Sequence, residues 1–155
     1  MVIKVIQIMS LMFAVVFISP VWASNNNVTY QSVDVQDATL TPSKDGSTAI
    51  LRFKFRNETS ETIILLGALT AGFETSEILV KVTDQKTQKL TALSVPSEEF
   101  LDLTTNHIFI KLAGGKMPAQ PTNEITLRLL LASGELPFVA HVEPYRSPRE
   151  KGKLK

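Results

Sequence analysis

The side chains able to bind a transition metal are few in this sequence. There is no cysteine, and the two histidines are His107 and His141. Three of the four methionines lie in an apolar N-terminal segment, which leaves Met117 as the remaining thioether. A zinc site usually takes four ligands from cysteine, histidine and carboxylate. The two histidines stand far apart, without the short spacing of such a site, so the sequence does not predict bound zinc.

Catalytic motifs are equally sparse. The sequence contains serines, histidines and aspartates, the residue types of a hydrolase triad, but no G-x-S-x-G motif marks a nucleophilic serine. Gly114-Gly115-Lys116 lacks the G-x-x-x-x-G-K-[ST] spacing of a phosphate-binding loop and precedes no predicted helix. We interpret this tripeptide as a tight turn between strands. The sequence therefore predicts a protein that is not an enzyme.

The N-terminal residues have the pattern of a secretory signal peptide. Lys4 is the only charged residue before an apolar run from Val5 to Val21, and Val21-Trp22-Ala23 resembles a cleavage signal. We expect residues 1–23 to be removed by cleavage after Ala23, leaving a periplasmic protein with no stable membrane insertion. An uncleaved anchor helix is the alternative, although the run is slightly shorter than the roughly 20 residues of a membrane span.

The charge of the predicted mature chain is balanced. The full sequence has 16 basic and 15 acidic residues, and removal of Lys4 makes the two numbers equal. A neutral protein has no electrostatic reason to bind nucleic acid. Residues 146–155, RSPREKGKLK, are basic and have no apolar periodicity, so they predict a disordered tail. The tail is interpreted as a solubilising end or, alternatively, as a contact with anionic lipid.

The remaining residues, 24–145, predict a single domain made of strands. Ala49–Arg56 alternates Leu51, Phe53 and Phe55 with basic residues, which is the period of a strand with one wet face. The same reasoning predicts further strands at Val28–Val35, Thr62–Leu69, Glu77–Val82, Lys89–Leu93, Phe100–Leu103, His107–Leu112, Ile125–Leu131 and Pro137–Val142.

Turn residues separate these strands, and no segment after residue 23 has helical periodicity. Examples of the turns are Lys44-Asp45-Gly46, Asn57-Glu58-Thr59 and Ser133-Gly134. Many short strands joined by such turns are typical of an all-β fold, here an Ig-like Greek-key β-sandwich in one domain.

The order of several short motifs resembles the periplasmic copper chaperone family PCu(A)C. Asp37-Ala38 follows the first predicted strand, Gly46-Ser47-Thr48-Ala49 leads into the next one, and Glu61–Leu69 reads ETIILLGAL. Downstream come His107-Ile108-Phe109, then Leu112–Pro118 and a leucine-rich strand ending in Ala132-Ser133-Gly134. The resemblance covers nearly the whole predicted domain and implies a cupredoxin-like β-sandwich.

The copper ligands implied by this resemblance are mostly missing. The family binds Cu(I) with two histidines and two methionines, which are soft ligands suited to a soft cation. Of these His107 is retained, and Phe109 replaces the methionine of the family's H-x-M motif. The other two ligand positions fall near Val80 and Leu90, which cannot coordinate. His107 with Met117, aided by His141, is the remaining candidate for a weak Cu(I) site, and an exposed strand residue is the alternative reading of His107.

Two functions follow from these observations. The first is a copper-chaperone-like protein with weak or lost Cu(I) binding that transfers copper to a receiving envelope protein. The second is a metal-free interaction or assembly protein that uses the same sandwich to hold another envelope protein. The two differ in whether removal of copper affects the contact with the partner.

Overall fold

The computed structural model describes residues 32–105, 107–117 and 123–145, which form ten strands. The described residues contain no helix, and so no helical segment there is long and apolar enough to cross a bilayer. The predicted signal peptide and basic tail lie outside these residues. The strands are β1 Val33–Pro42, β2 Ala49–Asn57, β3 Ile63–Leu69, β4 Thr75–Thr83, β5 Lys86–Leu90, β6 Leu93–Val95, β7 Phe100–Asp102, β8 Ile108–Ala113, β9 Glu124–Leu131 and β10 Gly134–Val142.

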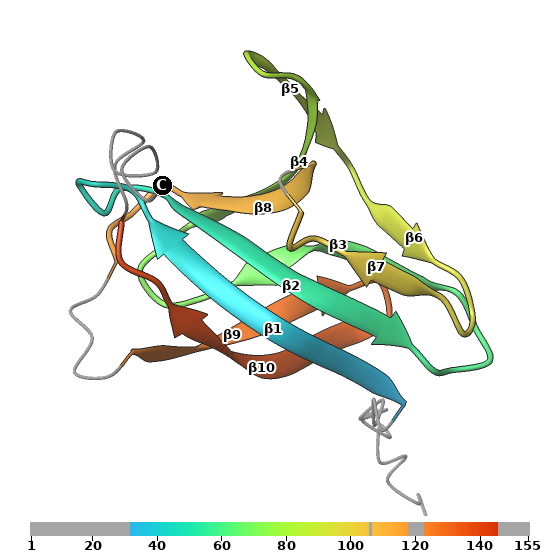
Figure 1. Ribbon diagram of the computed structural model, residues 1–155. Coiled ribbons are helices and arrows are strands. Elements are labelled where there is room, and N and C mark those ends of the chain that lie inside the picture. Colours follow the sequence, from blue (N-terminus) through green and yellow to red (C-terminus); the bar gives the residue numbers. More distant parts are fainter. Residues whose placement is uncertain (1–31, 106, 118–122, 146–155) are drawn as a thin grey trace, which may run out of the picture.

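The strands form an all-β sandwich, which confirms the predicted fold class. They follow the order β5-β4-β8-β2-β1-β10-β9-β3-β6, and β7 pairs with β2 beside β8. The pair β1 and β10 is parallel, and the other neighbouring pairs are antiparallel. The sheet folds over so that β4, β8, β2 and β1 face β10, β9 and β3, while β5 projects away from the body (Figure 1). A hydrogen bond joins β3 of one layer to β4 of the other, since the Ala68 amide donates to Ser76 Oγ at 2.9 Å.

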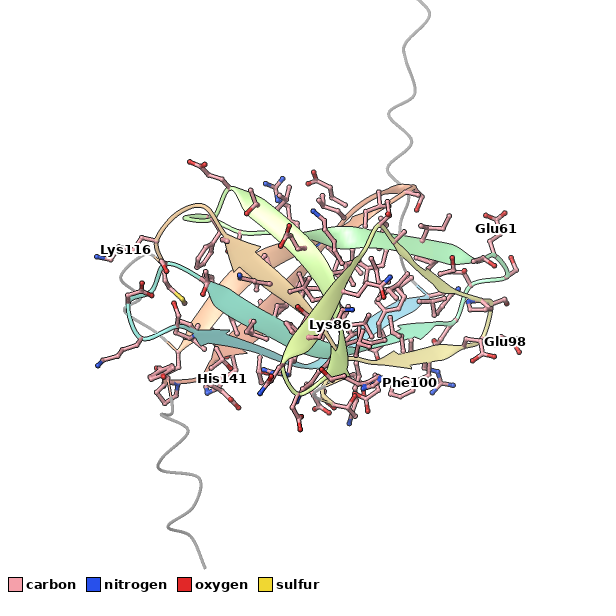
Figure 2. All side chains as sticks on the ribbon, turned by 90° about the horizontal axis from the view of Figure 1, so that it is seen from above. Glu61, Lys86, Glu98, Phe100, Lys116 and His141 are labelled. Atoms are coloured by element: carbon pink, nitrogen blue, oxygen red, sulfur yellow. The ribbon has the colours of Figure 1, made fainter. Side chains whose placement is uncertain are left out.

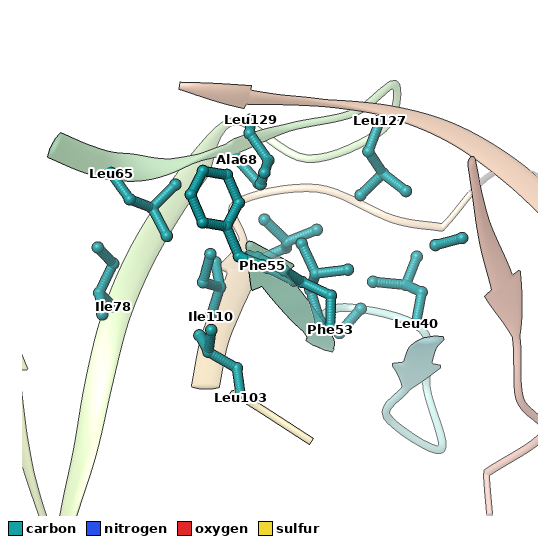
Figure 3. Packing of buried hydrophobic residues seen from close by; sticks show 14 of the residues in the cluster. Leu40, Phe53, Phe55, Leu65, Ala68, Ile78, Leu103, Ile110, Leu127 and Leu129 are labelled. Carbon is teal, nitrogen blue, oxygen red and sulfur yellow. The ribbon is translucent and has the colours of Figure 1, made fainter. Parts of the chain in front are cut away.

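The space between the layers is filled by the alternate residues of the long strands. In β2, Leu51, Phe53 and Phe55 are fully buried, as their alternation with basic residues predicts. The Phe53 ring lies 6.0 Å from that of Phe138 in the opposite layer. Figure 3 shows Phe53 and Phe55 among buried residues such as Leu65, Leu127 and Leu129 from the opposite layer. Other buried members are Leu40, Ile78, Leu103, Ile110 and Leu112.

The first strand differs from its prediction. Residues 28–31 lie outside the described part, and β1 continues well beyond Val35 to Pro42. Asp37 therefore lies within the strand, at a bulge where the register with β2 shifts. Its φ of 51° places it in the left-handed region, which aspartate tolerates better than most residues. Lys54 Nζ lies 2.6 Å from the Asp37 carboxylate and holds the bulge against β2.

The buried side chain of Asn57 holds two loops together by hydrogen bonds at one end of the sandwich. Asn57 has no exposed surface, and its amide donates to the carbonyls of Glu61, Val95 and Pro96 at 2.7–2.9 Å. Asn57-Glu58-Thr59 matches an N-glycosylation sequon, but this amide nitrogen is enclosed and already donates to three acceptors. Figure 2 shows Glu61 and Glu98 at this end of the molecule and Lys116 at the other.

Candidate functional site

His107 lies immediately before β8, at the edge of a shallow open depression. The residue is exposed, and its carbonyl accepts a hydrogen bond from the Lys81 amide at 2.7 Å. This bond extends the ladder between β4 and β8 by one step and places Lys81 opposite His107. The depression has a volume of about 580 Å³ and is lined by Lys81, Val82, Thr83, Asp84, Thr105 and His107. The His107 imidazole is thus accessible, with an ion pair of Lys81 and Asp84 at 2.8 Å beside it.

Phe109, two residues further on, shares the outer face of the sheet with His107, because alternate strand residues point to the same side. It lies opposite Leu79 in β4, and Leu79 in turn lies opposite Lys89 in β5. On the other side, the guanidinium of Arg52 in β2 lies over the Phe109 ring, 5.9 Å from its centre. Phe109, which the sequence resemblance places at the methionine of an H-x-M motif, is therefore an aromatic ring with a cation over it.

Arg52 remains charged in this position. Partial burial lowers the pKa of its guanidinium from the ordinary value, and the nearby Glu143 carboxylate opposes that shift. Arginine is effectively always protonated in proteins at neutral pH. The guanidinium beside Phe109 is therefore a cation at neutral pH.

The strand register shows which face of the sheet carries Val80 and Leu90, the residues nearest the two other implied ligand positions. Val80 lies opposite Ile108, and Leu90 lies opposite Ile78, which is buried in the core. Both residues are one step out of phase with Phe109 and belong to the inner face of the sheet. On the neighbouring strands β4 and β5, Leu79, Lys81 and Lys89 are among the residues that share the outer face with His107, and none of these three has a soft donor atom.

Met117 lies at the other end of β8 from His107. The strand between them has six residues, which span about 20 Å at roughly 3.4 Å per residue. The Met117 amide donates to the Gly46 carbonyl at 3.0 Å, and the side chain is half-buried against the core. Because metal–ligand bonds are only about 2 Å long, one ion cannot contact both His107 and Met117. The structure therefore does not support the predicted pairing of these two residues.

His141 is also remote from His107. It lies in β10 opposite Glu124 of β9, and its parallel neighbour in β1 is Thr39. Three strand spacings, roughly 14 Å, separate β10 from β8. Across the described ranges, no group of three or more histidine, aspartate or glutamate side chains could hold a metal ion.

Sequence reasoning found His107 and Phe109 but missed their cationic neighbours. Arg52 was visible as a basic residue on the wet face of the best predicted strand. What the sequence does not contain is the order of the strands, which places β2, β4 and β5 around β8.

Comparison with known proteins identifies the fold. No family model and no curated protein sequence matches this chain. Among solved structures, the copper-bound PCuAC domain from PmoF2 superimposes with a TM-score of 0.62 at 16% identity, covering 74% of this chain and 94% of that domain. This chain has the PCuAC fold.

Two further structures agree with that assignment. The apo PmoF2 PCuAC domain has a TM-score of 0.61 at 16% identity and covers 75% of this chain and 93% of its own. Apo-DR1885 from Deinococcus radiodurans has a TM-score of 0.55 at 19% identity and covers 91% of this chain and 97% of its own. The predicted resemblance to PCu(A)C proteins is thus confirmed at the level of the fold.

Proposed function

We propose that this protein is an exported, non-enzymatic copper-chaperone-like protein whose Cu(I) binding is weak or lost. The support for the copper-chaperone class is the PCuAC fold, which one of the similar structures has with copper bound. The support for weakened binding is the composition of the face beside His107. That single imidazole faces Lys81 across the ladder, and the next position on the strand that shares its face is Phe109 under Arg52.

The number of donor atoms decides the expected affinity. Each thioether or imidazole removed from a Cu(I) site removes one metal–ligand bond, and leucine or phenylalanine supplies no replacement. His107 is left as a single exposed ligand, with Met117 about 20 Å away along β8. A single imidazole on a protein surface holds copper far less tightly than a set of three or four soft ligands.

A competition titration against a Cu(I) chelator tests this function, with the PCuAC domain of PmoF2 measured in parallel. Wild type is expected to bind much more weakly than that domain. His107→Ala should remove the residual binding, and Met117→Ala should leave it unchanged. Phe109→Met should raise affinity, because it rebuilds an imidazole and a thioether on one face. Wild-type binding as tight as that of the PmoF2 domain would refute the proposal.

The proposed compartment rests on the N-terminal sequence. The signal-peptide pattern, with cleavage after Ala23, implies a mature periplasmic domain of residues 24–145 followed by the basic tail 146–155. Mass spectrometry of the protein from its native compartment would report the cleavage site and any bound metal together. An intact Met1 in a membrane fraction would contradict export by cleavage.

A second candidate function is a metal-free envelope interaction protein. It is favoured by the outer face of the β3–β9–β10 layer, where Ile64, Leu66 and Val139 are 39%, 44% and 56% exposed. Exposed apolar side chains on the outer face of a sheet are suited to a protein contact. In that case Leu66→Asp should abolish binding of the partner, and copper chelation should leave it intact, whereas transfer of copper to a partner would require the metal.

A further inference from the structure

A second, smaller hollow lies on the outer face of β1, β2 and β7, separate from the depression beside β8. Its volume is about 80 Å³, which is room for several water molecules. Phe100 lines it and is 53% exposed, so that a ligand can reach the ring. Figure 2 shows Phe100 toward the end of the molecule that carries Glu98. The other lining residues are polar, namely Asp34, Gln36, Lys54 and Arg56. An aromatic ring is thus combined with a few polar groups in one concave place, which is the usual composition of a small-ligand site.

The strand register brings these five side chains together. Arg56 in β2 lies opposite Asp34 in β1 and opposite Phe100 in β7. Two residues along β2, Lys54 lies opposite Gln36 of β1. Because alternate residues of a strand point to the same side, one face of the sheet carries all five. The hollow therefore rests on regular strands, which position side chains more precisely than loops do.

Contacts within the protein hold the polar groups of the hollow in place. Arg56 Nε lies 3.2 Å from a carboxylate oxygen of Glu58, and the Gln36 amide donates to one carboxylate oxygen of Asp34. Among the residues that the structure describes, these contacts leave the terminal amino groups of Arg56, the second oxygen of Asp34 and the side-chain carbonyl of Gln36 for a ligand. Groups that are already ordered lose less conformational entropy when a ligand binds.

The charges around the hollow favour a neutral ligand. Lys54 and Arg56 are cationic, but three carboxylates lie beside them. Asp37 is 2.6 Å from Lys54, Glu58 is 3.2 Å from Arg56, and Asp34 lines the hollow itself. A phosphate or a carboxylate would therefore meet as much negative charge as positive charge. Donors beside acceptors are suited to hydroxyl groups instead, because a hydroxyl both donates and accepts hydrogen bonds.

We propose that this hollow binds a neutral pyranose sugar. A face of a pyranose ring carries C–H groups, which pack against an aromatic ring because the face of that ring is partly negative. Phe100 supplies the ring. The hydroxyls of the same sugar would donate to Asp34 and Gln36 and accept from Arg56. The site goes beyond the proposed function and does not depend on copper, since neither His107 nor Phe109 lines the hollow.

An NMR titration of the isotope-labelled, metal-free mature chain tests this site. The probes are methyl β-glucoside and methyl β-N-acetylglucosaminide, each added up to about 50 mM, because a ligand held on one side only is expected to bind with a dissociation constant on the order of several mM. The backbone amide signals of Asp34, Arg56 and Phe100 should shift on saturation. The absence of any saturable shift at these residues with either sugar would overturn the proposal.

Two substitutions test the aromatic and the polar part of the hollow separately. Phe100→Ala should weaken sugar binding by roughly twofold to tenfold, the usual contribution of one aromatic contact. Asp34→Ala removes a charged acceptor and should weaken binding by roughly tenfold or more. Tyr145→Ala is the matched control and should have no effect, because this ring is also exposed but follows β10, at the other end of β1 from Asp34.

Thermal unfolding of each variant checks that the fold is retained, which is expected because Phe100 lies on the surface. Unchanged sugar binding by both the Phe100→Ala and the Asp34→Ala variants would overturn the site even if the wild type binds sugar elsewhere.

Further probes test the class of ligand and its source. Cyclohexanol has a ring without the set of hydroxyls, whereas inorganic phosphate and glycine represent an anion and a zwitterion. All three should bind more weakly than the sugars, and tighter binding by any of them would overturn the proposal. A β-1,4-linked oligomer of N-acetylglucosamine distinguishes a glycan chain, which should bind more tightly than its single unit, from a free sugar, for which the oligomer gains nothing. All of these measurements are made without copper, so their failure would leave the proposed function unchanged.

Discussion

The two ends of β8 differ in how firmly they are bound to the rest of the protein. At its carboxyl end the backbone is fastened to two other loops, since Lys116 donates to Gly72 at 2.8 Å and Met117 donates to Gly46 at 3.0 Å. At its amino end His107 is exposed beside an open depression of about 580 Å³. The fastened end fixes the fold, whereas the open end presents side chains whose chemistry can change without disturbing it.

This difference explains why the fold is retained while the implied ligands are not. The fastened end depends on backbone positions, such as Gly115, where any side chain would collide with the Gly72 carbonyl. The open end depends on the donor atoms of a few surface residues. The side chain of Phe109 lies on the outer face of β8 and takes no part in the backbone pairing of β4, β8 and β2.

The largest expected effect distinguishes the inner and outer aromatic residues of neighbouring strands. Phe53 is fully buried in β2, so Phe53→Ala should lower the free energy of unfolding by roughly 3–5 kcal/mol. Phe109→Ala on the outer face of β8 should cost clearly less, because the ring is only partly buried. Urea unfolding of both variants measures the difference. A loss below about 1 kcal/mol for Phe53→Ala would mean that the core is not where the structure places it.

Gly115→Ala tests the fastened end of β8 directly. A Cβ at this position would lie 1.9 Å from the Gly72 carbonyl oxygen, so the two loops would have to separate. We expect a loss of about 3 kcal/mol in chemical denaturation, at the upper end of the usual cost of overpacking. His107→Ala is the matched substitution at the open end and should stay within about 0.5 kcal/mol of wild type. Similar losses at both ends would remove the contrast between them.

The sequence predicted the regular parts of this molecule better than its irregular ones. Alternation identified β2, β8 and β9 because a strand with one buried face leaves a period of two. It missed the three-residue β6 and most of β1, whose regular alternation is broken by the bulge at Asp37. The candidate site was only half visible, because His107 and Phe109 are neighbours along one strand. Arg52 lies next to them because β2 is the neighbour of β8 in the sheet, and the alternation of residues along a strand does not predict the order of the strands.

Asn57→Ala tests the buried hydrogen bonds that hold two loops together at the end of the sandwich opposite Lys116. The substitution leaves the carbonyls of Glu61, Val95 and Pro96 without their donor. Buried acceptors that lose a partner cost about 1–3 kcal/mol, so we expect a loss of about 2 kcal/mol. Hydrogen exchange should show faster opening of the loops at 58–61 and 96–99 than of β8. An unchanged exchange rate in those loops would mean that other bonds hold them.

The smallest predicted effect concerns an exposed carboxylate in the turn beside Met117. Asp45 accepts hydrogen bonds from Ser43 Oγ at 2.7 Å, the Ser47 amide at 3.2 Å and Ser47 Oγ at 2.9 Å. These bonds, led by the one from Ser43, lower the pKa of Asp45 from 3.8 to about 2. The carboxylate therefore stabilises the folded turn above pH 4.

That contribution is lost as the pH falls from about 4 to about 2, because the unfolded chain takes up the proton first. Asp45→Asn should reduce stability slightly at pH 7 and remove this part of the acid sensitivity, so that its urea midpoint approaches that of wild type near pH 2. Other carboxylates with lowered pKa values, those of Glu77, Asp84 and Asp102, titrate in both proteins and cancel in the comparison. A constant difference between wild type and Asp45→Asn from pH 7 to pH 2 would show that the bonds to Ser43 and Ser47 do not depend on the charge. The protonated side chain of Asp45 would then hold the turn beside Met117 as well as the carboxylate does.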